Sequence, residues 1–78
     1  MSTSQPSPRH STICLLVNEE RVEVPAGTNV QQLLQQLGLQ RRGLAVEVNG
    51  EIVSQRSFDE RLLQGDDRVE VVSLMGGG

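Results

Sequence analysis

The 78-residue chain contains no lysine, one cysteine and one histidine, which leaves few side chains for enzyme chemistry. A phosphate-binding loop of the GxxxxGK type, a Schiff base and a pyridoxal phosphate site each need a lysine, so these classes are excluded. A hydrolytic triad needs a histidine beside its nucleophile, whereas His10 falls in a polar N-terminal segment. We therefore expect no catalytic residue among the side chains.

The single cysteine, Cys14, limits both disulfide and metal chemistry. One thiol cannot form an internal disulfide or a zinc site built on several cysteines, and this usage is typical of a reducing compartment. Cys14 falls within an apolar stretch, where a cysteine usually behaves as a small hydrophobic residue. Acidic pairs at 19–20 and 66–67 fall in predicted turns, where such residues are common, so we expect no metal site.

Aromatic side chains, positive charge and long apolar runs are also scarce. Phe58 is the only aromatic residue, and seven arginines face ten carboxylates, for a net charge of -3. Nucleic-acid binding normally uses a positive surface or aromatic stacking, so this composition favours a basic groove on a partner protein instead. No apolar run approaches the ~20 residues of a membrane span, and the N-terminal segment lacks the features of a signal peptide. We expect a cytoplasmic protein that binds neither nucleic acid nor membrane.

The length predicts one small domain, which has no room for a deep substrate cleft. Residues 1–11 are rich in serine, threonine and proline, and we expect them to be a disordered lead-in. Residues 12–74 form the predicted folding unit, and residues 75–78 are expected to be a flexible C-terminal tail. Such a chain is expected to be a monomer when free and to act with a larger partner rather than as an enzyme by itself.

Hydrophobic patterning in the first half predicts a hairpin followed by a helix. Residues 13–17 are wholly apolar and residues 21–24 alternate, which predicts a central strand paired with a half-exposed one. Thr28 is the predicted N-cap of the helix, and Gln31 closes a capping box with it. Apolar residues then keep helical spacing up to position 37, and Gly38 suits the left-handed position of a Schellman-type helix end.

The second half predicts another hairpin and a final strand. Residues 44–48 alternate up to an Asn-Gly pair at 49–50, which is a strong signal for a two-residue turn, and residues 52–53 return. Residues 54–64 contain apolar residues at 58, 62 and 63, whose spacing predicts one or two helical turns over the edge of the core. Residues 68–74 form the last strand. This order predicts an α+β roll, in which a mixed sheet of four to five strands carries one main helix across one face.

The two central strands are predicted to be apolar on both faces, because alternate residues of a strand point in opposite directions. If residues 13, 15, 17, 69 and 71 face the helix, then Cys14, Leu16, Val72 and Leu74 form an apolar strip on the open face. This strip is either an ordinary central region that loops partly cover or a docking patch for another protein. A partner that binds Leu16, Val72, Leu74 and Met75 would also direct the C-terminus.

The sequence ends on three glycines, Gly76, Gly77 and Gly78, directly after the last predicted strand. Backbone without side chains can enter a narrow channel, and residues 75–78 would span roughly 14 Å when extended. The ionised carboxylate of the last glycine is able to attack the α-phosphate of ATP, after which a thiol or persulfide would displace AMP. The alternative is that the glycines are a frayed terminus or a remnant of cloning.

These features together resemble the ThiS-type sulfur carriers of the thiamin pathway, which have the ubiquitin-like β-grasp fold. The resemblance covers residues 13–78 and rests on the order and spacing of several short segments. The matching segments are residues 17–19, 25–28 before Val30 and residues 33–34, 37–39, 48–53, 65–72 and the glycine end.

The resemblance implies a protein that other enzymes load and unload. In such families a ubiquitin-activating-type adenylyltransferase (ThiF-like) binds the sheet face and adenylates the terminal glycine, here Gly78. Sulfur from a cysteine desulfurase or a rhodanese-type donor then gives a C-terminal thiocarboxylate, which a thiazole synthase (ThiG-like) uses to build the thiazole ring. Gly77 corresponds to the penultimate glycine, and Gly76 extends the tail. The carrier itself is implied to bind no cofactor, because the activating partner uses the ATP.

Two other functions remain open on the sequence alone. One is the small subunit of molybdopterin synthase, which a stable complex with a molybdopterin-handling protein would identify. The other is a ubiquitin-like modifier or a plain interaction module. The absence of lysine favours a carrier over a chain-forming modifier, because an activated C-terminus finds no lysine to acylate on its own chain.

Overall fold

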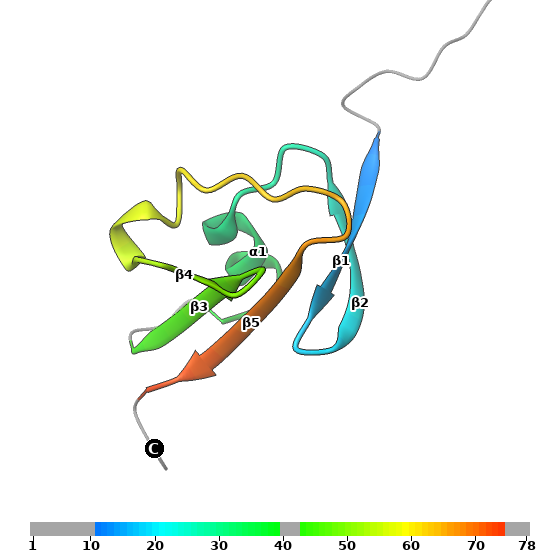
Figure 1. The fold of residues 1–78 in the computed structure, drawn as a ribbon. Coiled ribbons are helices and arrows are strands. Elements are labelled where there is room, and N and C mark those ends of the chain that lie inside the picture. Colours follow the sequence, from blue (N-terminus) through cyan, green and yellow to red (C-terminus); the bar gives the residue numbers. More distant parts are fainter. Residues whose placement is uncertain (1–10, 40–42, 75–78) are drawn as a thin grey trace, which may run out of the picture.

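The computed structural model describes residues 11–39 and 43–74. These residues form five strands, one α-helix and one short 3-10 helix (Figure 1). In chain order they are β1 (Thr12–Val17), β2 (Glu20–Pro25), α1 (Val30–Gln36), β3 (Leu44–Val48), β4 (Glu51–Val53), η2 (Gln55–Ser57) and β5 (Arg68–Ser73). The predicted disordered lead-in, apart from residue 11, and the predicted flexible tail lie outside the described residues and stay predictions.

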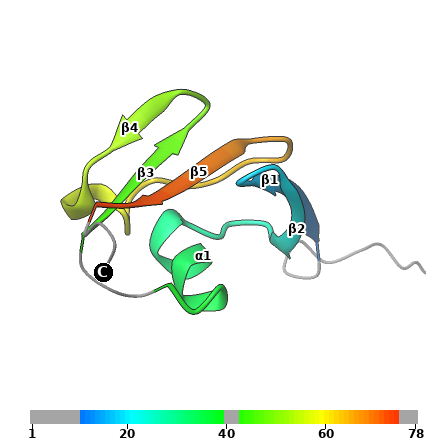
Figure 2. The same ribbon diagram turned by 90° about the horizontal axis from the view of Figure 1, so that it is seen from below.

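The strands form one mixed sheet in the order β2-β1-β5-β3-β4. β1 and β5 pair in parallel at the centre, whereas the other neighbours pair antiparallel. Helix α1 lies across one face of this sheet, and among the described elements no helix covers the opposite face (Figure 2). The predicted α+β roll is confirmed, and β5, the last strand in the sequence, is the middle strand of the sheet.

Both hairpins turn on two residues with positive φ, as type I′ turns require. In the first turn φ is 49° at Asn18 and 74° at Glu19. In the second turn φ is 53° at Asn49 and 83° at Gly50. Asparagine and glycine tolerate this left-handed region better than other residues, so the two turns fix where each hairpin reverses.

Helix α1 begins one residue later than predicted. The N-cap is Asn29, whose Oδ1 accepts a hydrogen bond from the Gln32 N–H at 2.8 Å, while Gln32 Oε1 accepts one from the Asn29 N–H at 3.0 Å. The predicted capping box of Thr28 and Gln31 is therefore wrong by one residue. The buried Thr28 instead donates its hydroxyl to the Pro25 carbonyl at 2.7 Å, which closes the turn before the helix.

The helix ends as predicted, with Gly38 in the left-handed region at φ 73°. The Leu39 N–H donates to the Leu34 carbonyl at 2.8 Å, and the Gly38 N–H donates to the Gln35 carbonyl at 3.1 Å. These two bonds define a Schellman motif, and they return Leu39 to the margin of the core. Within the described parts of the chain, no helix is long and apolar enough to cross a membrane.

The core lies between α1 and the face of the sheet that α1 covers. As predicted, residues 15, 17 and 69 are buried, and residues 13 and 71 pack against the core at its margin. The buried hydrophobic side chains are Leu15, Val17, Val24, Val30, Leu33, Leu34, Leu44, Val46, Val48, Val53, Phe58, Leu63 and Val69.

The segment between β4 and β5 is less helical than predicted. Only the three residues of η2 form a helical turn, after which Phe58 and Leu63 are buried. Leu62 is 58% exposed, so its predicted place over the core edge is wrong. The reason is that Leu62 forms an isolated β-bridge with Asn29, and alternate residues of an extended chain point in opposite directions.

Candidate functional site

The open face of the sheet carries an apolar patch beside the end of β5. Val72 pairs with Ala45 of β3 on this face, and Ile52 of β4 pairs with the outward-facing Glu47. Ile52 is 72% exposed, Val72 is 55% exposed, and Leu74, just beyond the strand, is 67% exposed. We call Ala45, Ile52, Val72 and Leu74 the C-terminal patch.

The composition of the C-terminal patch suits docking rather than catalysis. Three of its members are large apolar side chains that water reaches in the isolated chain. Ile52 lies on β4, whereas Val72 and Leu74 lie on and just beyond β5, and β3 with Ala45 runs between them. Contiguous exposed apolar surface often marks a protein-binding site. The predicted outward direction of Val72 and Leu74 agrees with these exposures.

Sequence reasoning missed Ile52 and Ala45. The pattern predicts that residues 52–53 form the second strand of the hairpin, but the pattern in this short segment does not show which of the two residues faces the core. The register of the second hairpin supplies the missing signal, because counting back from the turn at 49–50 places Ile52 opposite Glu47. A two-residue turn fixes this register, so the assignment was available from the sequence.

The other predicted members of the strip, Leu16 and Cys14, lie near the opposite end of β5. Leu16 pairs with Arg68, four residues before Val72, and both Leu16 and Cys14 are partly buried. At a rise of ~3.3 Å per residue, this separation is about 13 Å. Arg68 lies beside Leu16 at the beginning of β5, and Glu70 lies between Arg68 and Val72, so the strip consists of two apolar areas.

Two carboxylates border the C-terminal patch. Glu47 of β3 and Glu70 of β5 are directly opposite each other in the register, and both are half-buried. Neither belongs to the salt bridges of the described residues, which join other carboxylates to Arg61 and Arg68. Like charges in this arrangement weaken a sheet slightly, and they favour a partner surface that carries basic side chains.

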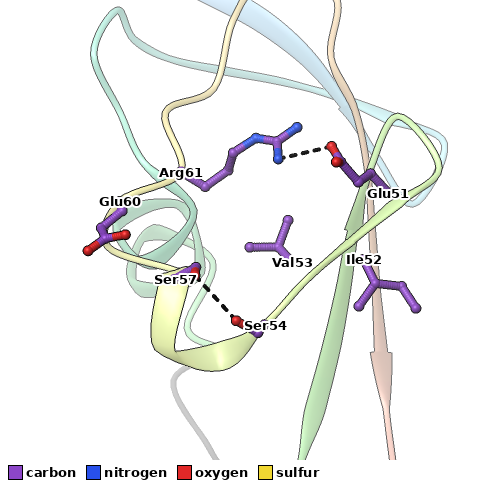
Figure 3. A pocket seen from close by; sticks show the side chains of 7 residues that line it. All are labelled: Glu51, Ile52, Val53, Ser54, Ser57, Glu60 and Arg61. Carbon is purple, nitrogen blue, oxygen red and sulfur yellow. Dashed lines mark hydrogen bonds and ion pairs between the residues drawn. The ribbon is translucent and has the colours of Figure 1, made fainter.

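A hollow beside β4 offers no comparable chemistry (Figure 3). Arg61 Nη1 lies 3.2 Å from Glu51 Oε1, and the hydroxyl oxygens of Ser54 and Ser57 are 3.3 Å apart. These polar groups pair with one another, and Ile52 points away from the Arg61 guanidinium. Across residues 11–39 and 43–74, no group of three or more histidine, cysteine, aspartate or glutamate side chains could hold a metal ion.

The predicted tail residues, Met75, Gly76, Gly77 and Gly78, lie outside the described residues. The last described residue, Leu74, donates its N–H to the carbonyl of Gly43, the residue before β3. This contact ties the point where the predicted tail begins to the edge of the C-terminal patch.

A model of the ThiS family matches residues 11–78, which include every described residue and the three glycines. The chain belongs to the ThiS family. The crystal structure of the thiamine biosynthesis protein ThiS from Geobacter metallireducens superimposes with a TM-score of 0.73 and 35% sequence identity. That match covers 85% of this chain and 100% of the Geobacter chain, and it confirms the predicted β-grasp fold.

Two curated relatives differ in how much of their own length this chain matches. The sulfur carrier protein ThiS of Escherichia coli is 28% identical over 64 residues, which are 82% of this chain and 97% of the relative. The thiazole synthase of Paramagnetospirillum magneticum is 38% identical over 64 residues, which are 82% of this chain. This chain spans only 20% of the length of that synthase, so the synthase contains a ThiS-like segment within a much longer chain.

Proposed function

We propose that this chain is a sulfur carrier protein of thiamin biosynthesis. Gly78 is adenylated at its α-carboxylate and converted to a thiocarboxylate, which donates sulfur for the formation of the thiazole ring. In this role the chain is a co-substrate of its partners and not an enzyme. The observation that carries the proposal is the family match, because it extends from the β-grasp domain through the glycine end.

The proposed chemistry has two steps at the C-terminus. A carboxylate oxygen of Gly78 attacks the α-phosphorus of ATP, and the bond to the β-phosphate breaks to release pyrophosphate. Hydrosulfide then attacks the acyl carbon, and the C–O bond to AMP breaks as the new C–S bond forms. If the donor is an enzyme persulfide, an acyl disulfide forms first, and a thiol must reduce its S–S bond. The ATP and the sulfur belong to the partners, so the carrier needs no bound cofactor.

The C-terminal patch is the proposed docking surface for the ThiF-like adenylyltransferase. Residues 75–78 would reach roughly 14 Å beyond Leu74 when extended, and glycines without side chains would fit a narrow channel to the ATP site. The apolar side chains of the patch provide the contact area. The facing carboxylates Glu47 and Glu70 favour a partner with a basic rim.

The thiazole synthase relative supports the thiamin pathway over molybdopterin synthesis. A segment similar to this chain is covalently part of that synthase, which suggests that such a domain works beside a thiazole-forming active site. We infer that a ThiG-like thiazole synthase is the sulfur acceptor. A cysteine desulfurase or a rhodanese-type protein is the proposed sulfur donor.

The glycine tail can be tested by ATP–pyrophosphate exchange with a ThiF-type adenylyltransferase from the same organism. We expect deletion of Gly78 and the Gly77→Val substitution each to abolish exchange. The deletion moves the terminal carboxylate to Gly77, one residue short of the ATP α-phosphate, and the valine side chain keeps the tail out of the channel. Gly65→Ala is a matched control, since a Cβ at Gly65 meets only Ile13 atoms at 4.0 Å. Normal exchange by both tail variants would refute the proposal.

The acceptor can be tested by mixing the sulfur-loaded carrier with thiazole synthase, its carbohydrate phosphate substrate and the small-molecule substrate that supplies the ring nitrogen. We expect thiazole formation that depends on loading. Sulfur transfer to the large subunit of molybdopterin synthase, without thiazole formation, would identify the alternative function.

A further inference from the structure

Among the described strands, only β3 runs beside β5 for nearly its whole length. β3 pairs with β5 from Val69 to Ser73. β1 pairs with β5 at Arg68 and Val69 and then ends, because the chain turns away at Asn18. Among the described strands, therefore, none runs on the β1 side of the second half of β5, which leads to the C-terminal patch. Without a partner on that side, the N–H and carbonyl of Val71 would favour fraying.

The side chain of Asn18 supplies hydrogen bonds where β1 ends. Its backbone N–H donates to the Val69 carbonyl at 2.9 Å, as a strand residue would. Its side-chain Oδ1 then accepts from the Val71 N–H at 2.8 Å, and its Nδ2 donates to the Val71 carbonyl at 3.3 Å. A carboxamide has the same donor and acceptor groups as a peptide bond, so Asn18 adds one more rung to the ladder. We call this pair of bonds the Val71 clamp.

The second hairpin turn provides an internal comparison. Asn49 occupies the same position in its turn as Asn18, and its Oδ1 accepts from the Arg68 N–H at 2.9 Å. Its Nδ2 donates to Asp67 Oδ1, also at 2.9 Å. Asn49 therefore holds the beginning of β5, whereas Asn18 holds the half that leads to Leu74.

The conformation of the turn explains the residue type at both positions but not the Val71 clamp. Asn18 has φ 49° and Asn49 has φ 53°, a region that asparagine tolerates. Glycine tolerates this region equally well and has no side chain. A glycine at either position therefore preserves the turn and removes only the side-chain hydrogen bonds.

We propose that Asn18 is a positioning residue for adenylation. The Val71 clamp keeps the end of β5 in the sheet, so that the C-terminal patch and the tail meet the adenylyltransferase in one orientation. This role rests on the proposed function. Without the clamp, docking must also order the end of β5, and the free-energy cost of this ordering weakens binding. Once docked, the tail reacts normally, so KM for the carrier rises while kcat is unchanged.

The test compares full-length Asn18→Gly and Asn49→Gly carriers in ATP–pyrophosphate exchange with a ThiF-type adenylyltransferase. We expect Asn18→Gly to raise KM for the carrier about tenfold, as the loss of two hydrogen bonds implies, with kcat unchanged. We expect Asn49→Gly to change KM less than about twofold, although each variant loses one bond from a β5 N–H and one bond that the asparagine Nδ2 donates. Equal KM values for the two variants, or a fall in kcat for Asn18→Gly, would overturn the proposal.

Amide hydrogen exchange tests the Val71 clamp independently of adenylation. The Val71 amide should exchange faster in Asn18→Gly than in wild type and remain protected in Asn49→Gly; unchanged protection in Asn18→Gly would show that the clamp does not hold β5. Asn18→Asp keeps an acceptor for the Val71 N–H and loses the donor, so its KM should be intermediate. A KM equal to that of Asn18→Gly would contradict a role for the Val71 N–H bond. If wild type supports no exchange of pyrophosphate, the proposed function fails, whereas the amide measurement still tests the clamp.

Discussion

The two faces of the sheet differ in what they contribute, although the same strands supply both. On the face that α1 covers, Val69 of β5 is 0% exposed. On the open face, Val72 of the same strand is 55% exposed. Three residues along one strand thus separate a core position from a surface position. The comparison implies that substitutions on the two faces of β5 can change stability and the proposed partner binding separately.

The covered face accounts for the stability of so small a domain. Its apolar side chains are removed from water against α1, and burial of this kind is the dominant favourable contribution to folding. The open face gains nothing comparable from folding, because its large apolar side chains remain exposed. A partner protein that covers these side chains would gain the free energy of burying them.

The largest expected effect comes from breaking the covered face. Leu33→Ala removes a side chain that is 0% exposed, and we expect it to lower the free energy of unfolding by about 2–5 kcal/mol. Urea unfolding measures this loss. Binding to the adenylyltransferase, measured per folded molecule, should stay unchanged. A loss of stability below about 1 kcal/mol would mean that the covered face is not the packed core that the structure shows.

The second-largest expected effect comes from a charged substitution on the open face. Leu74→Glu places a charge in the C-terminal patch, and we expect it to weaken binding to the adenylyltransferase at least about tenfold. The free energy of unfolding should change by less than about 0.5 kcal/mol, because Leu74 is 67% exposed. Titration calorimetry measures the affinity, and thermal unfolding measures the stability.

Leu62→Glu is the matched control, because Leu62 is 58% exposed but lies outside the C-terminal patch. It should leave the affinity for the adenylyltransferase unchanged. If both glutamate variants weaken binding equally, the effect is due to net charge and not to the patch. If Leu74→Glu unfolds the domain at unchanged affinity, its assignment to the open face is wrong.

The smallest expected effect comes from removing one negative charge on the open face. Glu70→Gln removes the repulsion between Glu70 and the facing Glu47, so we expect a gain in stability of a few tenths of a kcal/mol at low salt. Raising the salt concentration should reduce this gain, because dissolved ions reach the half-buried carboxylates and partly screen their repulsion. Affinity for a basic partner should fall slightly in the same variant. A loss of stability at low salt would contradict the repulsion.

The fold could be predicted largely from local signals. The Asn-Gly pair at 49–50 predicted the second hairpin, and Gly38 predicted the end of the helix, because each residue type suits a positive φ. The N-cap was misplaced because Thr28 and Asn29 are both good caps and each has a glutamine three residues later. Only tertiary contacts, such as the bond from Thr28 to Pro25, decide between them.

The candidate site was only partly predictable, because some of its contacts join residues that are far apart in the sequence. Val72 and Leu74 could be assigned from alternation within one strand. Ile52 could also have been assigned, because the two-residue turn at 49–50 fixes its register opposite Glu47. The Val71 clamp joins residues 53 positions apart, so no local pattern reveals that Asn18 holds β5.

The most direct test of the account is the mass of the C-terminal peptide after the chain is incubated with a ThiF-type adenylyltransferase, ATP and sulfide. We predict that one oxygen of the Gly78 carboxylate is replaced by sulfur, with fragment ions that place the change on this residue. The replacement should require ATP and disappear when Gly78 is deleted. An unchanged C-terminal mass under conditions that load a known ThiS protein would contradict the account.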